Sequence, residues 1–384
     1  MPVVHVLTPG DHFSPRTGSA IPTVVDGLCR FAPPGAPSAA VAVARGTYAD
    51  RYDSAAIVEY QAAAPLAGWA ARAVRVAEPV LGRLGLPRLD TRRVLRPSVG
   101  GQGGWPPGWV IGHNMPQLVP TVDAQRHRPV LYVHNDLLRT YSRGEAGRVL
   151  DRVAAVLTVS AFMAERTAAE LPLRLRSRVH VVPNGVDFER FRAAGPHRRS
   201  GMLRVAFIGR VTPEKGPDLL IEAVRLLGRA DLELTLIGSR GFTADDPLSP
   251  YERDLRRAAA GMAARVRFVP FVPRAQVPAL LADSDVVVVP SRFEEPFGLT
   301  VLEAMASHNV VVGARIGGIP EAMGGAGILV EPGNPRSVAE ALAALLDDEQ
   351  LLDRLAAECQ ARAARQDWAV SSARFHEVLA GLDG

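Results

Sequence analysis

The chain has 384 residues, of which 47% are hydrophobic and 22% charged, and its formal net charge is +4. This balance is typical of a soluble globular protein. Without a basic stripe or a recognisable binding module, it gives no reason to expect a nucleic-acid-binding protein. The length favours two domains over one. Among the 44 basic residues only Lys215 is a lysine, so its position needs a reason that arginine does not meet.

Short β-branched segments alternate with Ala-, Leu- and Arg-rich segments of helical period, which predicts repeated βα units and parallel sheets. In the first half, the expected strands are 3–8, 39–43, 56–59, 109–111, 130–134, 156–160 and 179–182, and the expected helices are 19–30, 66–84, 145–152 and 161–170. No apolar run approaches the ~18 residues of a membrane span, and no signal peptide precedes the first strand. We therefore expect a cytoplasmic protein with free thiols at Cys29 and Cys359.

A polar segment rich in helix breakers, 194–201, predicts a linker, after which the pattern restarts. The expected strands are then 203–208, 233–237, 266–269, 286–290, 310–314 and 327–330, and the expected helices are 217–228, 251–261, 276–283, 299–307, 335–346 and 349–365. We expect an α/β fold of two Rossmann-like, doubly wound parallel-sheet domains, 1–195 and 196–366, that face an interdomain cleft. A helix within 367–384 is expected to pack back on the first domain.

Residues 87–107 combine arginines with closely spaced glycines and follow no strand, which predicts a surface loop and not a dinucleotide-binding fingerprint. Between Arg72 and Arg96, arginines and apolar residues intermingle. This mixture leaves a second interpretation open, in which the region contacts the acceptor or makes a peripheral contact with a membrane surface.

A candidate phosphate site follows the first strand of the second domain. Gly209 allows a close turn, and Arg210 and Lys215 then precede a helix that is expected to begin at Pro217. Two cations near a helix N-terminus suit a phosphate or diphosphate, since arginine offers a fork of donors and lysine a compact charge. The alternative is a pair of solvated surface cations.

A second candidate site lies within 291–306, where Glu295 precedes a helix and Glu303 occupies its second turn. Because a carboxylate can accept two hydrogen bonds from a vicinal diol, each glutamate could hold a sugar ring. The turn between them exposes amides that suit an anion or sugar hydroxyls, at Phe297, Gly298, Leu299 and Thr300. A capped amphipathic helix is the alternative, but it leaves the charge of Glu303 without a partner.

These motifs resemble the retaining glycosyltransferases of family 4, also described as glycosyl transferases group 1, which have the GT-B fold. The resemblance covers nearly the whole chain and rests on the spacing of Gly209, Arg210 and Lys215 and of Glu295 and Glu303. Shorter matches lie at 182–187, 317–321 and 327–334 and near 367–368. The resemblance implies transfer of a hexose-type sugar from a nucleotide-diphosphate sugar, most often a UDP-sugar, to a hydroxyl of a small-molecule or glycan acceptor.

The resemblance also implies roles for single residues of the second domain. Arg210 and Lys215 would bind the diphosphate and stabilise it as it leaves, and Glu303 would hold the ribose. The donor sugar would contact Glu295 and the amides of Phe297, Gly298 and Leu299, while Thr300 would reach a phosphate. The base would bond near Val272, although Pro270 stands where the family often has glycine.

In the first domain, Gly18 matches the first glycine of a pair that the family places near the donor phosphate. Ser19 replaces the second glycine, and we expect it to cap the first helix. His134, at the end of an expected strand, resembles the family's active-site histidine, and the alternative is a satisfied loop histidine. Acceptor contacts are expected from His113, Asn114 and Asn135.

The two cations of the candidate phosphate site make a divalent ion unnecessary, so neither a metal nor another cofactor is expected. The resemblance then implies a front-face reaction that retains the anomeric configuration. Two alternatives use the same fold, namely a nucleotide-sugar epimerase or hydrolase and a non-catalytic nucleotide-sugar-binding protein. A nicotinamide dehydrogenase is disfavoured because no G-x-G-x-x-G lies between a strand and a helix. The resemblance, together with a residue usage typical of a GC-rich genome, favours a bacterial natural product or cell-surface glycan as the acceptor.

Overall fold

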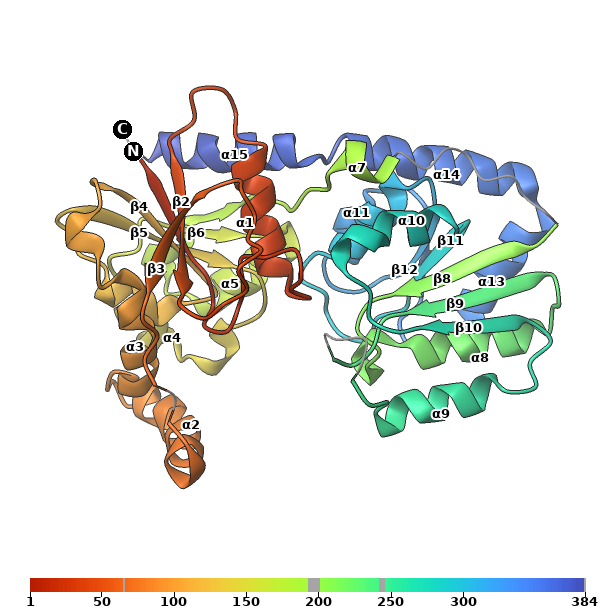
Figure 1. The fold of residues 1–384 in the computed structure, drawn as a ribbon, viewed down its shortest axis with the longest axis horizontal. Helices are drawn as coiled ribbons and strands as arrows, with labels where there is room; N and C mark the ends of the chain where they lie inside the picture. Colours follow the sequence, from red (N-terminus) through yellow and green to blue (C-terminus); the bar gives the residue numbers. More distant parts are fainter. Residues whose placement is uncertain (65, 193–200, 242–245, 383–384) are drawn as a thin grey trace. The chain divides into compact units, whose positions relative to one another are not determined.

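The computed structural model describes residues 1–64, 66–192, 201–241 and 246–382. These residues form two compact units, one made of Met1–Pro183 with Ser371–Gly384 and the other of Asn184–Val370. Each unit holds one parallel β-sheet with helices on both faces (Figure 1). The predicted α/β fold with two Rossmann-like sheets is therefore confirmed.

The sheet of the first unit has seven strands in the order β3-β2-β1-β4-β5-β6-β7. Its strands are β1 Val3–Val6, β2 Ala39–Ala44, β3 Ala56–Tyr60, β4 Gly108–His113, β5 His127–Val133, β6 Ala155–Thr158 and β7 Val179–Val181. The central strands are apolar and buried on both faces, as parallel strands between two helical layers must be. All seven strands lie where the alternation of segments predicts them.

The helices of this unit are α1 Ala20–Arg30, α2 Gly68–Arg83, α3 Leu89–Leu95, α4 Arg143–Val149, α5 Ala161–Glu170 and α6 Leu173–Arg176, with part of α15 Trp368–Gly381. The prediction of a loop over 87–107 is wrong, because α3 and two 3-10 turns, Arg96–Val99 and Gln102–Gly104, lie there. A carboxylate distant in sequence starts α3, since Glu78 Oε1 accepts the amide protons of Asp90 and Thr91 at 2.5 and 3.2 Å.

The sheet of the second unit has six strands in the order β10-β9-β8-β11-β12-β13. Its strands are β8 Leu203–Ile208, β9 Leu232–Ile237, β10 Arg265–Val269, β11 Val286–Val289, β12 Val310–Ala314 and β13 Ile328–Val330. Its helices are α7 Phe188–Arg192, α8 Pro217–Leu227, α9 Pro250–Ala259, α10 Val277–Ala282, α11 Leu299–Ala306, α12 Ile319–Met323, α13 Pro335–Asp347 and α14 Glu349–Ala364. On one face α8 packs against α9 and α13, and on the other α11 packs against α14 (Figure 1).

The chain passes between the units at Pro183–Asn184 and again within α15, ahead of the expected boundary at 195–196. Asn184 and Val186 belong to the second unit because Val186 bridges Asp367 and the Gln366 amide donates to the Asn184 carbonyl at 3.2 Å. The end of α15 joins the first unit, where the Ser372 hydroxyl donates to the Leu28 carbonyl at 2.7 Å. Residues 194–200 of the predicted linker, 194–201, lie outside the described residues.

Within the described ranges, no helix combines the length and apolar character that crossing a bilayer requires.

Candidate functional site

In the second unit, β8 lies between β9 and β11, so the chain leaves β8 and β11 toward opposite faces of the sheet. Ligands of such sheets bind outside the carboxyl ends of the strands at this switch point. The loops after β8 and β11 are closely packed there. Gly216, with φ +72°, lies so near the loop after β11 that a Cβ atom would be 2.3 Å from the Pro290 carbonyl oxygen. The predicted phosphate and sugar motifs therefore meet.

Lys215 and Glu295 form an ion pair across these two loops. Lys215 Nζ donates to Glu295 Oε1 at 2.6 Å, and the Ser291 hydroxyl donates to the same oxygen at 2.7 Å. The ammonium also lies 4.9 Å from the centre of the Phe293 ring, which adds a cation–π contact. The ammonium group of Lys215 thus links the loop after β8 to the loop after β11.

Glu303 also has a cationic partner. Arg274, at the start of a 3-10 turn after β10, donates to Glu303 Oε1 at 2.5 Å. The sequence motif requires a partner for this charge on an apolar helix but does not identify Arg274, because the two residues belong to separate βα units. A turn that carries an arginine is too common to have indicated it.

The two glutamates share one feature that bears on ligand binding. Each is about 5% exposed, and each has Oε1 held by a cation. In the described part of the chain, no donor forms a hydrogen bond with Oε2 of either glutamate. Neither Oε2 atom is a solvent-inaccessible atom without a hydrogen bond, so both remain accessible. Each carboxylate is thereby fixed in orientation with its second oxygen open to a ligand.

The backbone around Glu295 is held by a glycine pair. The Gly318 amide donates to the Glu295 carbonyl at 2.7 Å. A Cβ on Gly317, where φ is +60°, would lie 2.5 Å from the same carbonyl oxygen. Only glycine permits this approach, which accounts for Gly317 and Gly318 in the sequence.

Helix α11 begins without a side-chain cap. Gly298, with φ +97°, is its N-cap residue, so no side chain accepts from the first amides at Leu299 and Thr300. Phe297 is buried beneath this turn. The amides that the sequence singles out therefore start an uncapped helix beside Glu295, where their partial positive charge favours an anion or hydroxyl oxygen.

Arg210, Gly209 and Val272 lie at the same edge of the sheet. Arg210 is exposed and makes no ion pair or side-chain hydrogen bond with the described residues. Gly209, with φ +150°, lies beside Gly238, where a Cβ would approach the Gly209 carbonyl oxygen to 2.0 Å. Val272 follows β10 and is half-buried. Thus Lys215 is already paired, whereas the Arg210 charge is free to meet a ligand.

In the first unit, three histidines form a hydrogen-bonded chain across neighbouring strands. His5 Nδ1 lies 2.9 Å from His113 Nε2, and His113 Nδ1 lies 2.8 Å from His134 Nε2. Their rings contact one another in series, and Phe375 of α15 stacks on His5. His5 is a functional candidate that the sequence reasoning missed, and a histidine inside the apolar strand Val3–Val6 is the signal that could have revealed it.

Burial keeps all three imidazoles neutral. Desolvation, with a smaller effect from His376, lowers the pKa of His5 to about 3. Desolvation and the neighbouring His5 lower the pKa of His134 to about 3. The pKa of His113 is lowered as well, by burial and by the histidines on either side. A neutral imidazole carries one N–H, so all three rings donate in one direction along the chain.

This chain fixes what His134 offers to a ligand. Its Nε2 is engaged by His113, its amide donates to Asn114 Oδ1 at 2.7 Å, and its side chain is almost fully buried. No described residue bonds to its Nδ1. Whether Nδ1 donates or accepts is therefore set by the tautomers of His113 and His5.

The other predicted residues of the first unit differ in exposure. His113 is fully buried and can act only through His134. Asn114 has φ +57° and orients the His134 backbone, whereas Asn135 and Gly18 are exposed. The prediction that Ser19 caps α1 with its side chain is wrong. Ser19 occupies the N-cap position, but its hydroxyl bonds to Asp11 instead. Burial raises the pKa of Asp11, and the hydrogen bond from Ser19 partly offsets this rise.

Among the described residues, no group of three or more His, Cys, Asp or Glu side chains is arranged to hold a metal ion.

Comparison with known proteins bears on what these sites do. Residues 203–348, which contain the Lys215–Glu295 site, match the family described as Glycosyl transferases group 1. D-inositol 3-phosphate glycosyltransferase of Corynebacterium glutamicum is 36% identical over 217 residues, covering 52% of this chain and 51% of that protein. The chain thus spans about half the length of that relative. Spore coat protein SA of Bacillus subtilis is 30% identical over 264 residues, covering 63% of this chain and 70% of that protein.

Solved structures resemble the entire chain. Anabaena HepE in complex with UDP and glucose superimposes with a TM-score of 0.70 and 19% identity, covering 99% of both chains. Sucrose-phosphate synthase from Thermosynechococcus elongatus gives a TM-score of 0.73 and 16% identity, covering 100% of this chain and 99% of that one. At these identities the likeness establishes the fold.

Proposed function

The chain belongs to the glycosyl transferases of group 1, and from this membership we propose that it transfers a sugar from a nucleotide-diphosphate sugar to an acceptor hydroxyl. The proposed donor is a UDP-sugar, and the proposed outcome is retention of the anomeric configuration. The observation that carries the proposal is the pair of buried glutamates, each with one oxygen held by a cation and the other open. Such carboxylates match the diols of a ribose and a hexose.

The donor site that we propose uses the residues at the switch point of the second unit. Glu303 binds the ribose hydroxyls through Oε2, and Arg274 holds its other oxygen. Glu295 binds the sugar together with the amides of Phe297, Gly298 and Leu299, while Thr300 reaches a phosphate. Val272 bonds the base through its main chain. HepE, a structural neighbour, was crystallised with UDP-glucose, which supports a UDP-sugar as the first donor to test.

Arg210 and Lys215 act on the leaving group in this proposal. As the bond between sugar C1 and the phosphate oxygen breaks, positive charge develops on the sugar and negative charge on the nucleoside diphosphate. Arg210 supplies a forked donor and Lys215 a compact ammonium, which together stabilise the developing charge. The acceptor oxygen bonds to C1 on the same face, and its proton passes to an oxygen of the departing phosphate.

In the first unit, we propose that His134 orients the donor sugar or acceptor by a hydrogen bond from or to Nδ1. Because burial holds the pKa of His134 at about 3, the ring acts as a neutral partner and not as a general acid. Gly18, Asn114 and Asn135 are proposed as further contacts with the substrates. His113 contributes by fixing the ring of His134.

A donor panel with product analysis tests this proposal. Thermal shift with UDP-, GDP- and ADP-sugars identifies the donor, and turnover is then measured with pooled polyols, glycosides and D-inositol 3-phosphate. The last compound is included because it appears in the name of several relatives. We expect nucleoside diphosphate release that depends on the acceptor, with the donor's anomeric configuration in the product by NMR. An inverted product would reject retention.

The same panel distinguishes the two alternative functions. Donor consumption without an acceptor would favour an epimerase or hydrolase that uses the same donor site. A thermal shift without any turnover would favour a nucleotide-sugar-binding protein.

A further inference from the structure

Helix α2 turns its apolar side toward solvent. Trp69 is 83% exposed, Val76 70% and Val80 52%, and their spacing of seven and four residues places them on one face of the helix. Leu84 and Leu89, which follow the helix, are 73% and 70% exposed. A helix that packs on a globular core normally shows the opposite arrangement, with its apolar stripe facing inward.

Contacts on the opposite side fix this orientation. Glu78 holds the start of α3 through the Asp90 amide and the Thr91 hydroxyl, both at 2.5 Å. Gly82 lies so close to Glu145 of α4 that a Cβ would be 2.1 Å from its Oε1, and Arg148 donates to the Gly82 carbonyl at 3.1 Å. Rotation that buried the apolar stripe would break these polar contacts.

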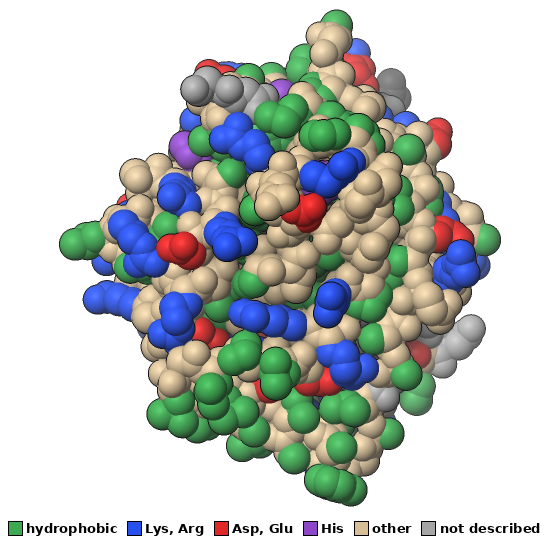
Figure 2. Space-filling view, turned by 90° about the vertical axis from the view of Figure 1, so that its left-hand side faces the viewer, with side chains coloured by type: hydrophobic (Ala, Val, Ile, Leu, Met, Phe, Trp, Pro, Cys, Tyr) green, Lys and Arg blue, Asp and Glu red, His purple; other side chains and the backbone are tan. Residues whose placement is uncertain are grey.

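Arginines border the apolar stripe. Arg72 lies one helical turn before Val76, and Arg83 lies three residues after Val80. Arg72, Arg75 and Arg83 are exposed, and none forms an ion pair with a described residue. In the space-filling view, apolar side chains gather at the lower end of the molecule, where α2 lies, with basic side chains above them (Figure 2).

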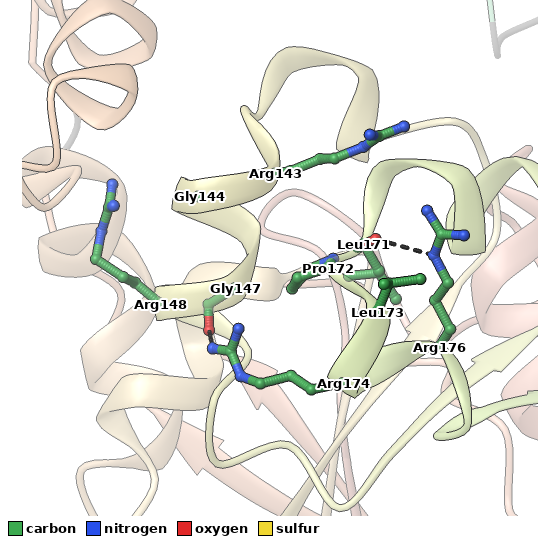
Figure 3. Close-up of a pocket in the computed structure, with 9 residues that line it drawn as sticks. All are labelled: Arg143, Gly144, Gly147, Arg148, Leu171, Pro172, Leu173, Arg174 and Arg176. Carbon is green, nitrogen blue, oxygen red and sulfur yellow. Dashed lines mark hydrogen bonds between the residues drawn. The ribbon is translucent and has the colours of Figure 1, made fainter.

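A pocket rich in arginine adjoins α2 through Arg148, on the side of the helix opposite the apolar stripe. Its volume is about 420 Å³, and it is lined by α4 and the segment 171–176, which contribute Arg143, Arg148, Arg174 and Arg176 (Figure 3). Each guanidinium is held by a main-chain carbonyl, for example Arg143 by Ala169 at 3.0 Å. Among the described residues, only Arg174 of these four has a carboxylate partner, Asp151 at 3.2 Å. Carbonyls position the cations without neutralising their charge.

We propose that the apolar stripe of α2 and the arginines that border it dock on a bilayer that contains anionic phospholipid. The stripe of Trp69, Val76 and Val80 enters the interface between head groups and acyl chains, and the arginines bind lipid phosphates.

The charges favour a membrane over another protein chain. A two-fold dimer formed through α2 would bring together the arginines that border both copies of the stripe, and like charges across an interface oppose association. An anionic lipid surface matches both the positive charge and the apolar stripe. The inference does not depend on the proposed enzymatic function, because none of these residues belongs to the donor site.

Vesicle sedimentation with the full chain tests the proposal. The probe is phosphatidylglycerol in phosphatidylcholine vesicles, with pure phosphatidylcholine as the reference. We expect binding only with the anionic lipid, decreasing as salt screens the charges. Arg72→Gln combined with Arg83→Gln should weaken binding roughly 25-fold, about fivefold for each arginine. Arg336→Gln, an exposed arginine of the second unit, is the matched control and should leave binding unchanged.

Tryptophan emission tests insertion of the stripe directly. Trp69 is 83% exposed, whereas Trp105 is half-buried and Trp109 and Trp368 are buried, so vesicles should shift the emission of Trp69 to the blue and brominated lipid should quench it. Val76→Ser with Val80→Ser should weaken binding by about tenfold or more, whereas Leu226→Ser, at a similarly exposed leucine of the second unit, should not.

Three outcomes would overturn the proposal. The first is equal binding to neutral and anionic vesicles. The second is an unchanged Trp69 spectrum with bound vesicles. The third is self-association that the Val76→Ser and Val80→Ser pair abolishes, which would assign the face to a second copy of the chain.

Discussion

Replacing Lys215, the only lysine, separates its role in folding from its role toward the donor. Lys215→Ala removes the cation that lies 2.6 Å from Glu295, whose side chain is 8% exposed while that of Lys215 is 23% exposed. Breaking a fully buried pair costs about 3–5 kcal/mol. Because Lys215 is partly solvated, we expect a loss of about 1–3 kcal/mol in the free energy of unfolding.

The loss in catalysis is a separate quantity from this loss in the free energy of unfolding. A preorganised charge that meets developing negative charge contributes about 2–4 kcal/mol, so kcat/KM should fall by about 30-fold to about 1,000-fold. Lys215→Arg keeps the positive charge, so its kcat/KM should fall less than that of Lys215→Ala. The matched control is Arg204→Gln, which breaks the 2.9 Å pair with Asp285 at the opposite, amino-terminal end of β8. It should lower stability without lowering the affinity for a nucleoside diphosphate.

A chemical assay exploits the lone lysine. Reductive methylation with ¹³C-formaldehyde labels Lys215 and the N-terminus alone, so the spectrum should contain two assignable signals. Adding UDP should shift the Lys215 signal and protect the side chain from modification, while the N-terminal signal stays constant. If UDP binds and leaves the Lys215 signal unmoved, or if Lys215→Ala retains full kcat/KM, the assignment of this residue to the diphosphate is incorrect.

Three further predictions address the rest of the site. Glu303→Gln removes a charge-assisted acceptor, so it should weaken UDP binding by about tenfold or more. It should also abolish the discrimination against 2′-deoxy-UDP. Calorimetry that finds this discrimination retained would exclude the ribose role of Glu303. Gly317→Ala and Gly325→Ala place a side chain at φ +60° and +87°, but only the former meets the Glu295 carbonyl, so only it should reduce turnover severely; equal effects would contradict this. Between about pH 6.5 and their lowered pKa values, the buried histidines bind no proton in the folded state, whereas in the unfolded chain they do. The free energy of unfolding therefore decreases as the pH is lowered through this range, by about 1.4 kcal/mol per histidine per pH unit. His5→Phe should make this slope, measured by urea unfolding, shallower, and an unchanged slope would mean that His5 titrates in the folded protein.

The periodicity of the sequence predicts most of the fold because each βα unit is a local pattern. A β-branched run followed by a helical one indicates the element whatever its neighbours are. The short helices α3 and α6 of the first unit are exceptions. The start of α3 depends on Glu78, which lies twelve residues before Asp90 and caps α3 from the preceding helix. No local pattern in 87–107 contains that information.

The candidate site shows the same division between local and distant causes. The motif of Glu295 and Glu303 is local, and so its placement around the start of α11 follows from the sequence. Their partners come from elsewhere, Lys215 from the loop after β8 and Arg274 from the turn after β10. Which cation meets which carboxylate depends on the order of strands in the sheet, which the linear pattern does not specify.

Helix α2 illustrates a further limit. The sequence predicts the helix itself and its mixture of arginine and apolar residues. The direction of its apolar stripe depends on the contacts of Glu78 and Gly82 with the rest of the first unit. Amphipathic period alone would place that stripe against the core, as in most globular proteins.

The most direct test of the proposed donor site is a crystal structure of the protein with UDP. We predict phosphate oxygens within hydrogen-bond distance of Lys215 Nζ and Arg210, and ribose hydroxyls on Oε2 of Glu303. A nucleotide bound away from the loops after β8 and β11, with the Lys215–Glu295 pair undisturbed and both Oε2 atoms still open, would contradict the account.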